Sequence, residues 1–209
     1  MKLVDISPPL SERIAVWPGD VAFEHVVSMG FDQGDHLGLS SIRTTVHVGA
    51  HTDAPSHYSA HGEGIQQRPL ERYFGRCEVM HVSVPQGHRI QPRDLPRAPS
   101  EPRVLIGTGT YPDPHLFNED FAALSPELVA YLHDHGVQLV GIDTPSVDLC
   151  QDRELLSHNA ISDRDMAILE GVVLRHVADG VYTLIALPLP IEGSDASPVR
   201  AVLVDPPVA

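Results

Sequence analysis

The stretch SPELVAYLHDHGVQLVGID, residues 125–143, carries a helix signal followed by a buried-strand signal. Ser125 precedes a proline, an order typical of an N-cap followed by the first helical residue. The helix is expected to run to His135 and to stop at Gly136, which tolerates the left-handed backbone of a helix end. The LVGID run is apolar up to Asp143 and suits a strand covered on both faces. The stretch therefore predicts a layered α/β structure.

Strand signals outnumber helix signals along the rest of the chain. Further helices are expected over Pro69–Phe74 and from Ser157 to Asp165. We therefore expect a mixed α/β fold rich in strand, with one domain over residues 1–209. Runs of β-branched and apolar residues predict strands over Leu3–Ser7, Val21–Met29, Leu39–Val48, Cys77–Val84, Val104–Gly107, Gln138–Asp143, Ala167–Glu170, Tyr182–Leu189 and Val199–Val204.

Composition narrows the class of partner. The chain has 14 Lys and Arg against 28 Asp and Glu, a net charge of −14. An acidic chain repels phosphate backbones and anionic membranes, so we expect no nucleic-acid or membrane partner. The first residues lack the apolar core of a secretory signal, and no run reaches the roughly 20 apolar residues of a membrane span. We expect a cytoplasmic protein in which Cys77 and Cys150 stay free thiols.

Four candidate metal ligands lie within HVGAHTDAPSH, residues 47–57: His47, His51, Asp53 and His57. A helix is disfavoured here by Gly49 and by the following proline. A fully extended chain would place His47 and His51 roughly 13 Å apart, whereas one ion needs its nitrogen ligands at about 2.0–2.1 Å. The chain must therefore turn at Gly49-Ala50. Beyond the turn, His51 and Asp53 point to the same side of an extended segment.

The donor set predicts a divalent transition metal. Imidazole and carboxylate groups without thiolates suit Zn²⁺, and also Mn²⁺, Fe²⁺ or Co²⁺. The carboxylate of Asp53 has two oxygens and can bridge two ions. Asp143 and Asp148 follow a buried strand, and we expect them to fix backbone geometry and not to bind metal. Nine histidines are not assigned to the site: His25, His36, His61, His81, His88, His115, His133, His135 and His176.

The segment 47–57 is similar to the H-x-G-[TA]-H-x-D-A-P-x-H signature of the cyclase family of metal-dependent hydrolases, and within it to the bacterial kynurenine formamidases. Ala50 stands where many members carry Thr. The similarity covers nearly the whole chain. It includes PPL (8–10), VWPGD (16–20), GIDTPSVD (141–148), ILEG (168–171) and LIALPLPIEGSDASPVRAVL (184–203). The resemblance implies a β-rich β/β/α layering of the swivelling type in a single domain.

The resemblance also implies two metal ions per subunit, expected to be Zn²⁺ with Mn²⁺ or another divalent ion as an alternative. Asp53 matches a carboxylate that bridges both ions, and Glu170 matches one that contacts both. The implied metal ligands are His47, His51, Asp53, His158 and Glu170.

The same resemblance implies the reaction. His57 matches a histidine that donates and accepts protons, and Trp17 matches an aromatic residue that packs on the substrate. The expected activity is an arylformamidase. A metal-activated water hydrolyses N-formyl-L-kynurenine to L-kynurenine and formate, a step of tryptophan degradation. The expected assembly is a homodimer or higher homo-oligomer, with Val21–Met29 as a candidate exchanged arm.

Two alternatives remain open. One is another cyclase-family amidase acting on a cyclic or aromatic amide such as isatin, which Trp17 does not distinguish from the first. The other is a metal-binding or interaction protein without activity, which the presence of His57 disfavours. A serine hydrolase is disfavoured because the chain has no G-x-S-x-G elbow.

Overall fold

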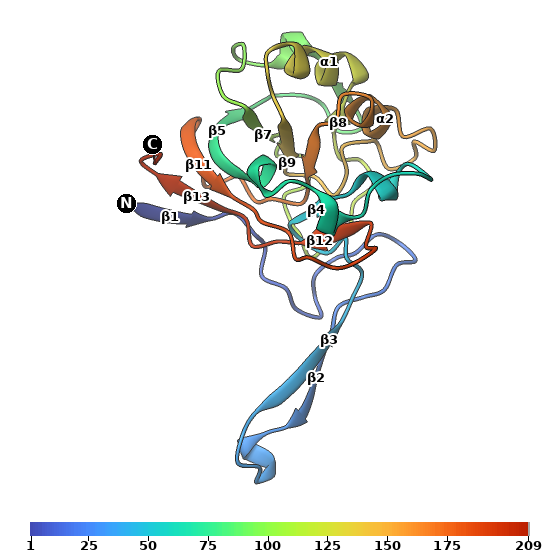
Figure 1. The fold of residues 1–209 in the computed structure, drawn as a ribbon, viewed down its shortest axis with the longest axis vertical. Helices are drawn as coiled ribbons and strands as arrows, with labels where there is room; N and C mark the ends of the chain where they lie inside the picture. The colour runs from blue at the N-terminus through green and yellow to red at the C-terminus, as the bar shows by residue number, and fades with distance from the viewer. Residues whose placement is uncertain (209) are drawn as a thin grey trace.

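A seven-stranded mixed sheet forms the centre of the molecule (Figure 1). The computed structural model describes residues 1–208, so Ala209, the last residue of the predicted domain, lies outside the described residues. The sheet has six strand pairings. The three on one side of the sheet are antiparallel, and the three on the other side are parallel. The strand order is β1 (Lys2–Asp5), β13 (Val202–Asp205), β11 (Gly180–Ile185), β5 (Phe74–His81), β7 (Arg103–Gly107), β9 (Leu139–Ile142) and β10 (Ala167–Leu169).

Different layers cover the two faces of this sheet. Helices α1 (Pro126–Asp134) and α2 (Leu156–Ser162) pack on one face, and the pair β4 (His51–Asp53) and β12 (Ala196–Pro198) lies on the other (Figure 1). The alternation of side chains divides the core accordingly. In β7, Val104 and Ile106 join the cluster under the helices, whereas Leu105 joins the opposite cluster. The predicted mixed α/β class, rich in strand, is confirmed.

The stretch 125–143 folds as predicted. Ser125 Oγ accepts a hydrogen bond from Leu128 N at 3.0 Å, which satisfies an orphan donor at the start of α1. The helix ends at Asp134, one residue before the predicted end, and Gly136 takes a positive φ of 84°. All four residues of β9 are buried, because helices cover one face and the second layer covers the other.

Several element boundaries differ from the prediction. The strand expected over Leu39–Val48 ends at Arg43 as β3, because residues 44–50 bend before β4. The strand expected over Tyr182–Leu189 ends at Ile185, ahead of two prolines that have no N–H for a ladder. The helix expected over Pro69–Phe74 is a 3₁₀ turn over Leu70–Tyr73.

The remaining short elements connect these layers. Strands β6 (Arg89–Ile90) and β8 (Ala123–Leu124) form a small parallel pair. The other 3₁₀ turns cover Phe31–Gln33, Pro55–His57, Ile65–Gln67 and Pro92–Asp94.

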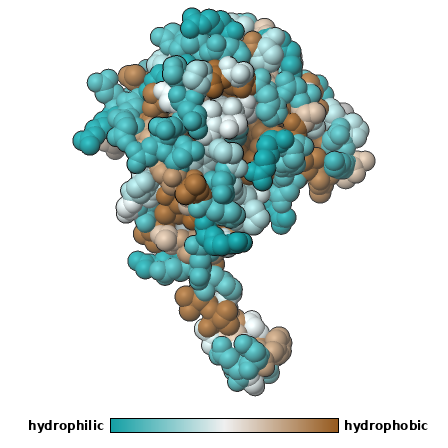
Figure 2. All heavy atoms as spheres, turned by 180° about the vertical axis from the view of Figure 1, so that it is seen from behind, coloured by the Kyte–Doolittle hydropathy of each residue, from teal (hydrophilic) through white to brown (hydrophobic). Residues whose placement is uncertain are grey.

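A hairpin of β2 (Glu24–Met29) and β3 (Leu39–Arg43) extends away from the body of the molecule (Figure 1). Nearly all its side chains are exposed, including the apolar Val26 and Ile42. Figure 2 shows apolar atoms on this arm. Among residues 1–208, no helix is both long enough and apolar enough to cross a membrane.

Candidate metal centre and active-site cavity

Backbone pairing places His51 and Asp53 beside Glu170. Strand β4 pairs with β12, with Asp53 opposite Ala196. On its other side, His51 N donates to Glu170 O at 3.1 Å, and Glu170 N donates to His51 O at 2.9 Å. Glu170 directly follows β10 of the main sheet. The ladder therefore fixes the two motif residues against a carboxylate that lies more than a hundred positions away in sequence.

Two glycines permit this close approach. Gly49 has a φ of +59° and makes the predicted turn between His47 and His51. Gly171 has a φ of +65°, and a Cβ there would lie 2.2 Å from Gly49 O. No other residue type fits that contact without moving the backbone.

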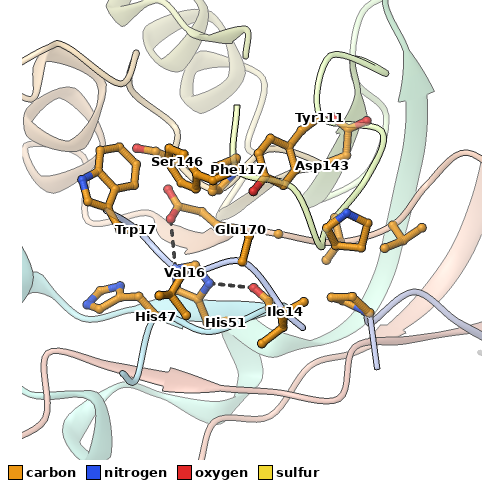
Figure 3. Close-up of a pocket in the computed structure, with 18 of the residues that line it drawn as sticks. Ile14, Val16, Trp17, His47, His51, Tyr111, Phe117, Asp143, Ser146 and Glu170 are labelled. Atoms are coloured by element: carbon orange, nitrogen blue, oxygen red, sulfur yellow. Dashed lines mark hydrogen bonds and ion pairs between the residues drawn. The ribbon is translucent and has the colours of Figure 1, made fainter. Parts of the chain in front are cut away.

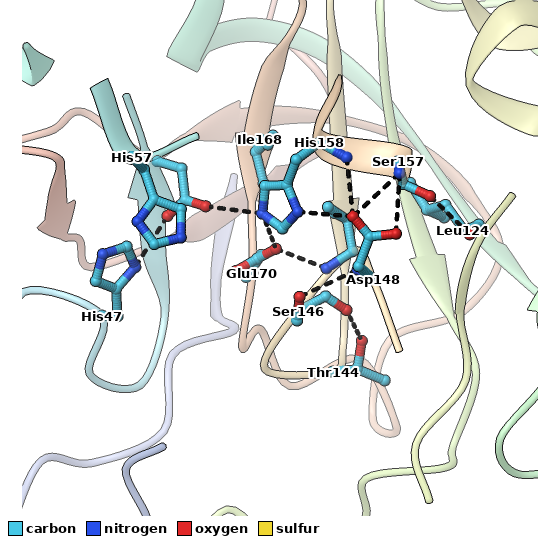
Figure 4. A network of polar contacts seen from close by, with 12 residues as sticks. His47, His57, Leu124, Thr144, Ser146, Asp148, Ser157, His158, Ile168 and Glu170 are labelled. Carbon is cyan, nitrogen blue, oxygen red and sulfur yellow. Dashed lines mark hydrogen bonds and ion pairs between the residues drawn. The ribbon is translucent and has the colours of Figure 1, made fainter. Parts of the chain in front are cut away.

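Helix α2 brings His158 to the same place, and Asp148 orients it (Figure 4). Asp148 Oδ2 accepts from His158 N at 3.0 Å and lies 2.8 Å from His158 Nδ1. Ser157 N also donates to this carboxylate, and Arg89 Nη1 donates to it at 2.8 Å. Burial raises the pKa of Asp148, but these donors hold it well below its usual range. As expected, Asp148 fixes the geometry of its neighbours.

The predicted ligands converge on the two oxygens of Asp53. Oδ1 lies 3.1 Å from His47 Nδ1 and 3.6 Å from His51 Nε2. Oδ2 lies 3.4 Å from His158 Nε2. Glu170 is the last of the predicted ligands. Its Oε2 lies 3.1 Å from His51 Nε2, and its Oε1 lies 3.8 Å from His158 Nε2 (Figures 3 and 4). The donors therefore divide into two neighbouring groups that share the carboxylates of Asp53 and Glu170.

The facing atoms lack hydrogen-bond partners. Across residues 1–208, seven buried side-chain polar atoms have none, and four of them are His51 Nε2, His158 Nε2 and both Asp53 oxygens. Their contacts fall within 3.1–3.8 Å but do not meet hydrogen-bond geometry. Buried polar atoms are normally paired, so orphaned nitrogen and oxygen atoms that face one another fit a metal site.

In three of the histidines, the ring nitrogen that points away from the Asp53 carboxylate lies against a hydrogen-bond acceptor. His51 Nδ1 lies 2.9 Å from Gly49 O, and His158 Nδ1 lies against Asp148. His47 Nε2 lies 2.9 Å from Asp195 Oδ2. Each contact holds one ring nitrogen as a donor and leaves the other facing the Asp53 carboxylate, the orientation typical of metal-ligating histidines. The sequence prediction missed Asp195, because no local spacing connects it to residues 47–57.

The electrostatics of the metal-free site are strongly perturbed. Burial lowers the pKa of His47, but the carboxylates of Asp53 and Asp195 outweigh it and raise the pKa to about 9. Burial also lowers the pKa of His158, but the carboxylates of Asp148 and Asp53 outweigh it and raise the pKa to about 10. Burial raises the pKa of Asp53, but His158 and His47 bring it well below its usual range. When no metal is bound, protons on His47 and His158 therefore balance the negative charge of the carboxylates. A metal that binds here must displace these protons.

His57 lies at the open side of this centre. It ends the 3₁₀ turn Pro55–His57, and its side chain is 33% exposed. Its ring centroid is 4.3 Å from that of His47 and 5.7 Å from that of His158. Its Nδ1 lies 3.4 Å from Asp195 Oδ2. A half-exposed histidine beside a buried centre can exchange protons with a bound molecule and with water.

A cavity of about 730 Å³ opens over the centre, with His51, His158 and Glu170 among its lining residues (Figure 3). Its aromatic wall contains Trp17 and two residues that the sequence prediction missed, Tyr111 and Phe117. The Trp17 and Phe117 rings meet edge to face, with centroids 5.4 Å apart. Trp17 lies in the segment between β1 and β2, whereas Tyr111 and Phe117 share the loop between β7 and β8, so only the fold brings Trp17 to the other two.

Asp143 also lines the cavity, and its carboxylate is bound to backbone. Thr108 N and Gly109 N donate to it at 2.9 Å. Burial raises the pKa of Asp143, and these donors only partly offset it. This agrees with the expectation that Asp143 fixes backbone geometry.

Comparison with known proteins gives a consistent result. The model of the Cyclase family matches residues 4–149. A Bordetella petrii protein named kynurenine formamidase is 41% identical over 204 residues, covering 97% of each chain.

Solved structures share the fold. A structure described as a potential metal-dependent hydrolase with cyclase activity superposes with a TM-score of 0.82 at 26% identity, covering 97% of this chain and 96% of that chain. Isatin hydrolase A from Labrenzia aggregata, bound to benzyl benzoate, superposes with a TM-score of 0.81 at 20% identity, covering 97% and 93%. The second likeness shows the fold alone. The chain therefore belongs to the Cyclase family and is a metal-dependent hydrolase.

Proposed function

We propose that this chain is one catalytic domain that hydrolyses N-formyl-L-kynurenine to L-kynurenine and formate, a step of tryptophan degradation. The observation that carries the proposal is the 41% identity to a kynurenine formamidase over nearly the full length of both chains. The cavity over the His and Asp centre supports it, because it offers an aromatic wall and a candidate metal site together.

The donor set supports two zinc ions, with manganese as an alternative. One ion would be held by His47, His51 and Asp53, and the other by His158, with Asp53 and Glu170 facing both. The orphaned atoms of His51, His158 and Asp53 support this division. A divalent metal bound here lowers the pKa of a water towards neutral and polarises a carbonyl group.

His57 is the proposed proton carrier. Hydrolysis breaks the formyl C–N bond, joins a water oxygen to the formyl carbon and puts a proton on the leaving arylamine nitrogen. His57 lines the cavity and has its Nδ1 turned to Asp195, which leaves Nε2 for accepting and delivering that proton.

Trp17 is the proposed substrate contact, together with Tyr111 and Phe117. Their rings offer edges and faces to an aryl group, a contact that favours aromatic substrates. Trp17 is 37% exposed in this structure, so a bound ring would cover apolar surface that now faces solvent.

Charge on the cavity wall favours formylkynurenine over isatin. Arg175 is the sole Lys or Arg among the described residues that line the cavity. Arg175 lies five positions after Glu170, it is exposed, and its Nη1 donates to the backbone oxygen of Pro112, another lining residue, at 2.8 Å. Formylkynurenine carries an α-carboxylate at the end opposite the formyl-bearing ring, whereas isatin is neutral. Arg175 would pair with that carboxylate.

The exposed hairpin supports the proposed homodimer. Isolated two-stranded hairpins are marginal in water, and this one exposes apolar side chains on both strands. Val26 is 53% exposed and Ile42 is 63% exposed. We propose that the arm packs on a second copy of the chain.

A cytoplasmic location is also proposed. Cys77 and Cys150 are free thiols, as expected in a reducing compartment. Burial raises the pKa of the Cys77 thiol to about 12, which keeps it protonated and unreactive.

Hydrolysis of N-formyl-L-kynurenine by the purified protein should vanish after chelation and return with zinc. Release of kynurenine, followed by absorbance, measures it. Isatin and N-formylaniline should be assayed as alternative substrates under the same conditions. Turnover of isatin without turnover of formylkynurenine by zinc-loaded protein would favour the alternative activity instead.

His158→Ala should lower the metal content to about half, because His158 faces only one of the two donor groups. Metal analysis of the purified variant measures this. His61→Ala is the control and should keep full occupancy, because His61 is exposed and belongs neither to the cavity lining nor to the clustered candidate ligands. Full occupancy in His158→Ala would remove this residue from the ligand set.

His57→Ala should keep its metal and lose turnover by about 10²–10⁴-fold, because the proton carrier is lost while the ligands remain. The kcat of the variant and that of the native enzyme should be measured at equal metal content. A variant that loses metal in parallel with activity would make His57 a ligand.

Arg175→Ala should raise KM for N-formyl-L-kynurenine about tenfold or more, as expected for a lost charge-assisted hydrogen bond. KM for neutral N-formylaniline should not change. Arg153→Ala, at an exposed arginine, is the control. An equal rise in KM for both substrates would mean that Arg175 acts only through its hydrogen bond to Pro112 O.

Light scattering of the purified protein should give the mass of a dimer. Val26→Lys with Ile42→Lys should shift the mass towards a monomer, because charge replaces the apolar contact. Leu116→Lys, which changes an apolar side chain that is 67% exposed on the body, should leave the dimer intact. A monomeric native protein would contradict the assembly.

A further inference from the structure

One carboxylate oxygen connects a proposed metal ligand with the proposed proton carrier. Asp195 Oδ2 lies 2.9 Å from His47 Nε2 and 3.4 Å from His57 Nδ1. An ionised carboxylate only accepts hydrogen bonds, so both of these ring nitrogens carry hydrogen. A metal bound at the centre would displace the proton of His47 Nδ1, which faces Asp53 at 3.1 Å, and the lone pairs would then lie on His47 Nδ1 and His57 Nε2.

We infer that Asp195 is a positioning residue that fixes the tautomers of His47 and His57 together. In this arrangement a single side chain presents the lone pair of His47 to the metal position and the lone pair of His57 to the substrate. The two other ligand histidines have separate partners, Gly49 O and Asp148. Among residues 1–208, Asp195 is the one side chain within hydrogen-bonding distance of both a proposed ligand histidine and His57.

The backbone around Asp195 is held by the strands that carry the ligands. Ala54 N donates to Asp195 O at 2.8 Å, and Ala196 pairs with Asp53 across β12 and β4. Ile65 N donates to Ser194 O at 2.9 Å on the preceding residue. The backbone that carries the Asp195 side chain is therefore fixed relative to Asp53.

Asp195 acts through the histidines and not on the substrate. His47 and His57 line the cavity, whereas Asp195 is not among the lining residues. Its side chain is 46% exposed, in contrast to 1–3% for Asp53, His51, His158 and Glu170. A partly exposed carboxylate at hydrogen-bonding distance suits an orienting role, and it leaves room for a small carboxylate from solution to replace it.

The test uses the zinc-loaded enzyme with ¹⁵N-labelled histidine. In the native protein, the NMR shifts of His57 should report hydrogen on Nδ1 and a lone pair on Nε2. Asp195→Ala should give a mixture of tautomers at His57. It should also weaken metal binding about 10–100-fold in competition with a chelator. These two readouts need no substrate, so they stand even if the proposed function fails.

The kinetic readout rests on the proposed function. Asp195→Ala should lower kcat for N-formyl-L-kynurenine with little change in KM, and added acetate should restore part of it. Asp195→Asn keeps an acceptor oxygen and should retain more activity than Asp195→Ala. Glu192→Ala, at an exposed acid three residues away, is the control and should behave like the native enzyme.

Two results would overturn the inference. One is an unchanged His57 tautomer in Asp195→Ala. The other is loss of one metal equivalent in both Asp195→Asn and Asp195→Ala with the His57 tautomer intact, because Asp195 would then be a metal ligand.

Discussion

The buried Asp53 carboxylate is the constraint on which the surrounding structure depends. Both of its oxygens are buried without a hydrogen-bond donor. An isolated buried charge of this kind costs several kcal/mol unless cations compensate it. Three histidines surround it, and the raised pKa values of His47 and His158 show how strongly the site demands positive charge. A divalent metal bound here would satisfy this demand and would supply the chemistry of hydrolysis at the same point.

The fold meets this constraint by combining residues from four segments, which lie in β4, next to β12, in α2 and at the end of β10. The β12–β4 ladder holds His51, Asp53 and Asp195, and the end of β10 adds Glu170 through a two-bond bridge. Helix α2 adds His158, with Asp148 as its orienting partner. The loops that carry the aromatic wall then leave a cavity on the open side (Figure 3). The layers therefore position the candidate metal ligands, and the loops shape the cavity.

The local parts of this arrangement were predictable from sequence, and the long-range parts were not. The turn at Gly49 and the extended His51–Asp53 pair follow from residue type and spacing, as does the capped helix after Ser125. His158 and Glu170 entered only through the family resemblance, because their approach to Asp53 depends on the order of strands in the sheet. Asp195 was missed for the same reason, although it lies in a segment that matches the family. Strand ends were misplaced where prolines or tertiary contacts ended the ladders.

Anomalous X-ray diffraction at the zinc absorption edge, on crystals of the zinc-loaded enzyme, tests the central claim most directly. The account predicts two peaks, one between Asp53 Oδ1 and the His47 and His51 rings, and one between Asp53 Oδ2 and His158. Both should contact Glu170. Density that leaves the Asp53 oxygens without a metal, or that places the zinc elsewhere on the chain, would contradict it.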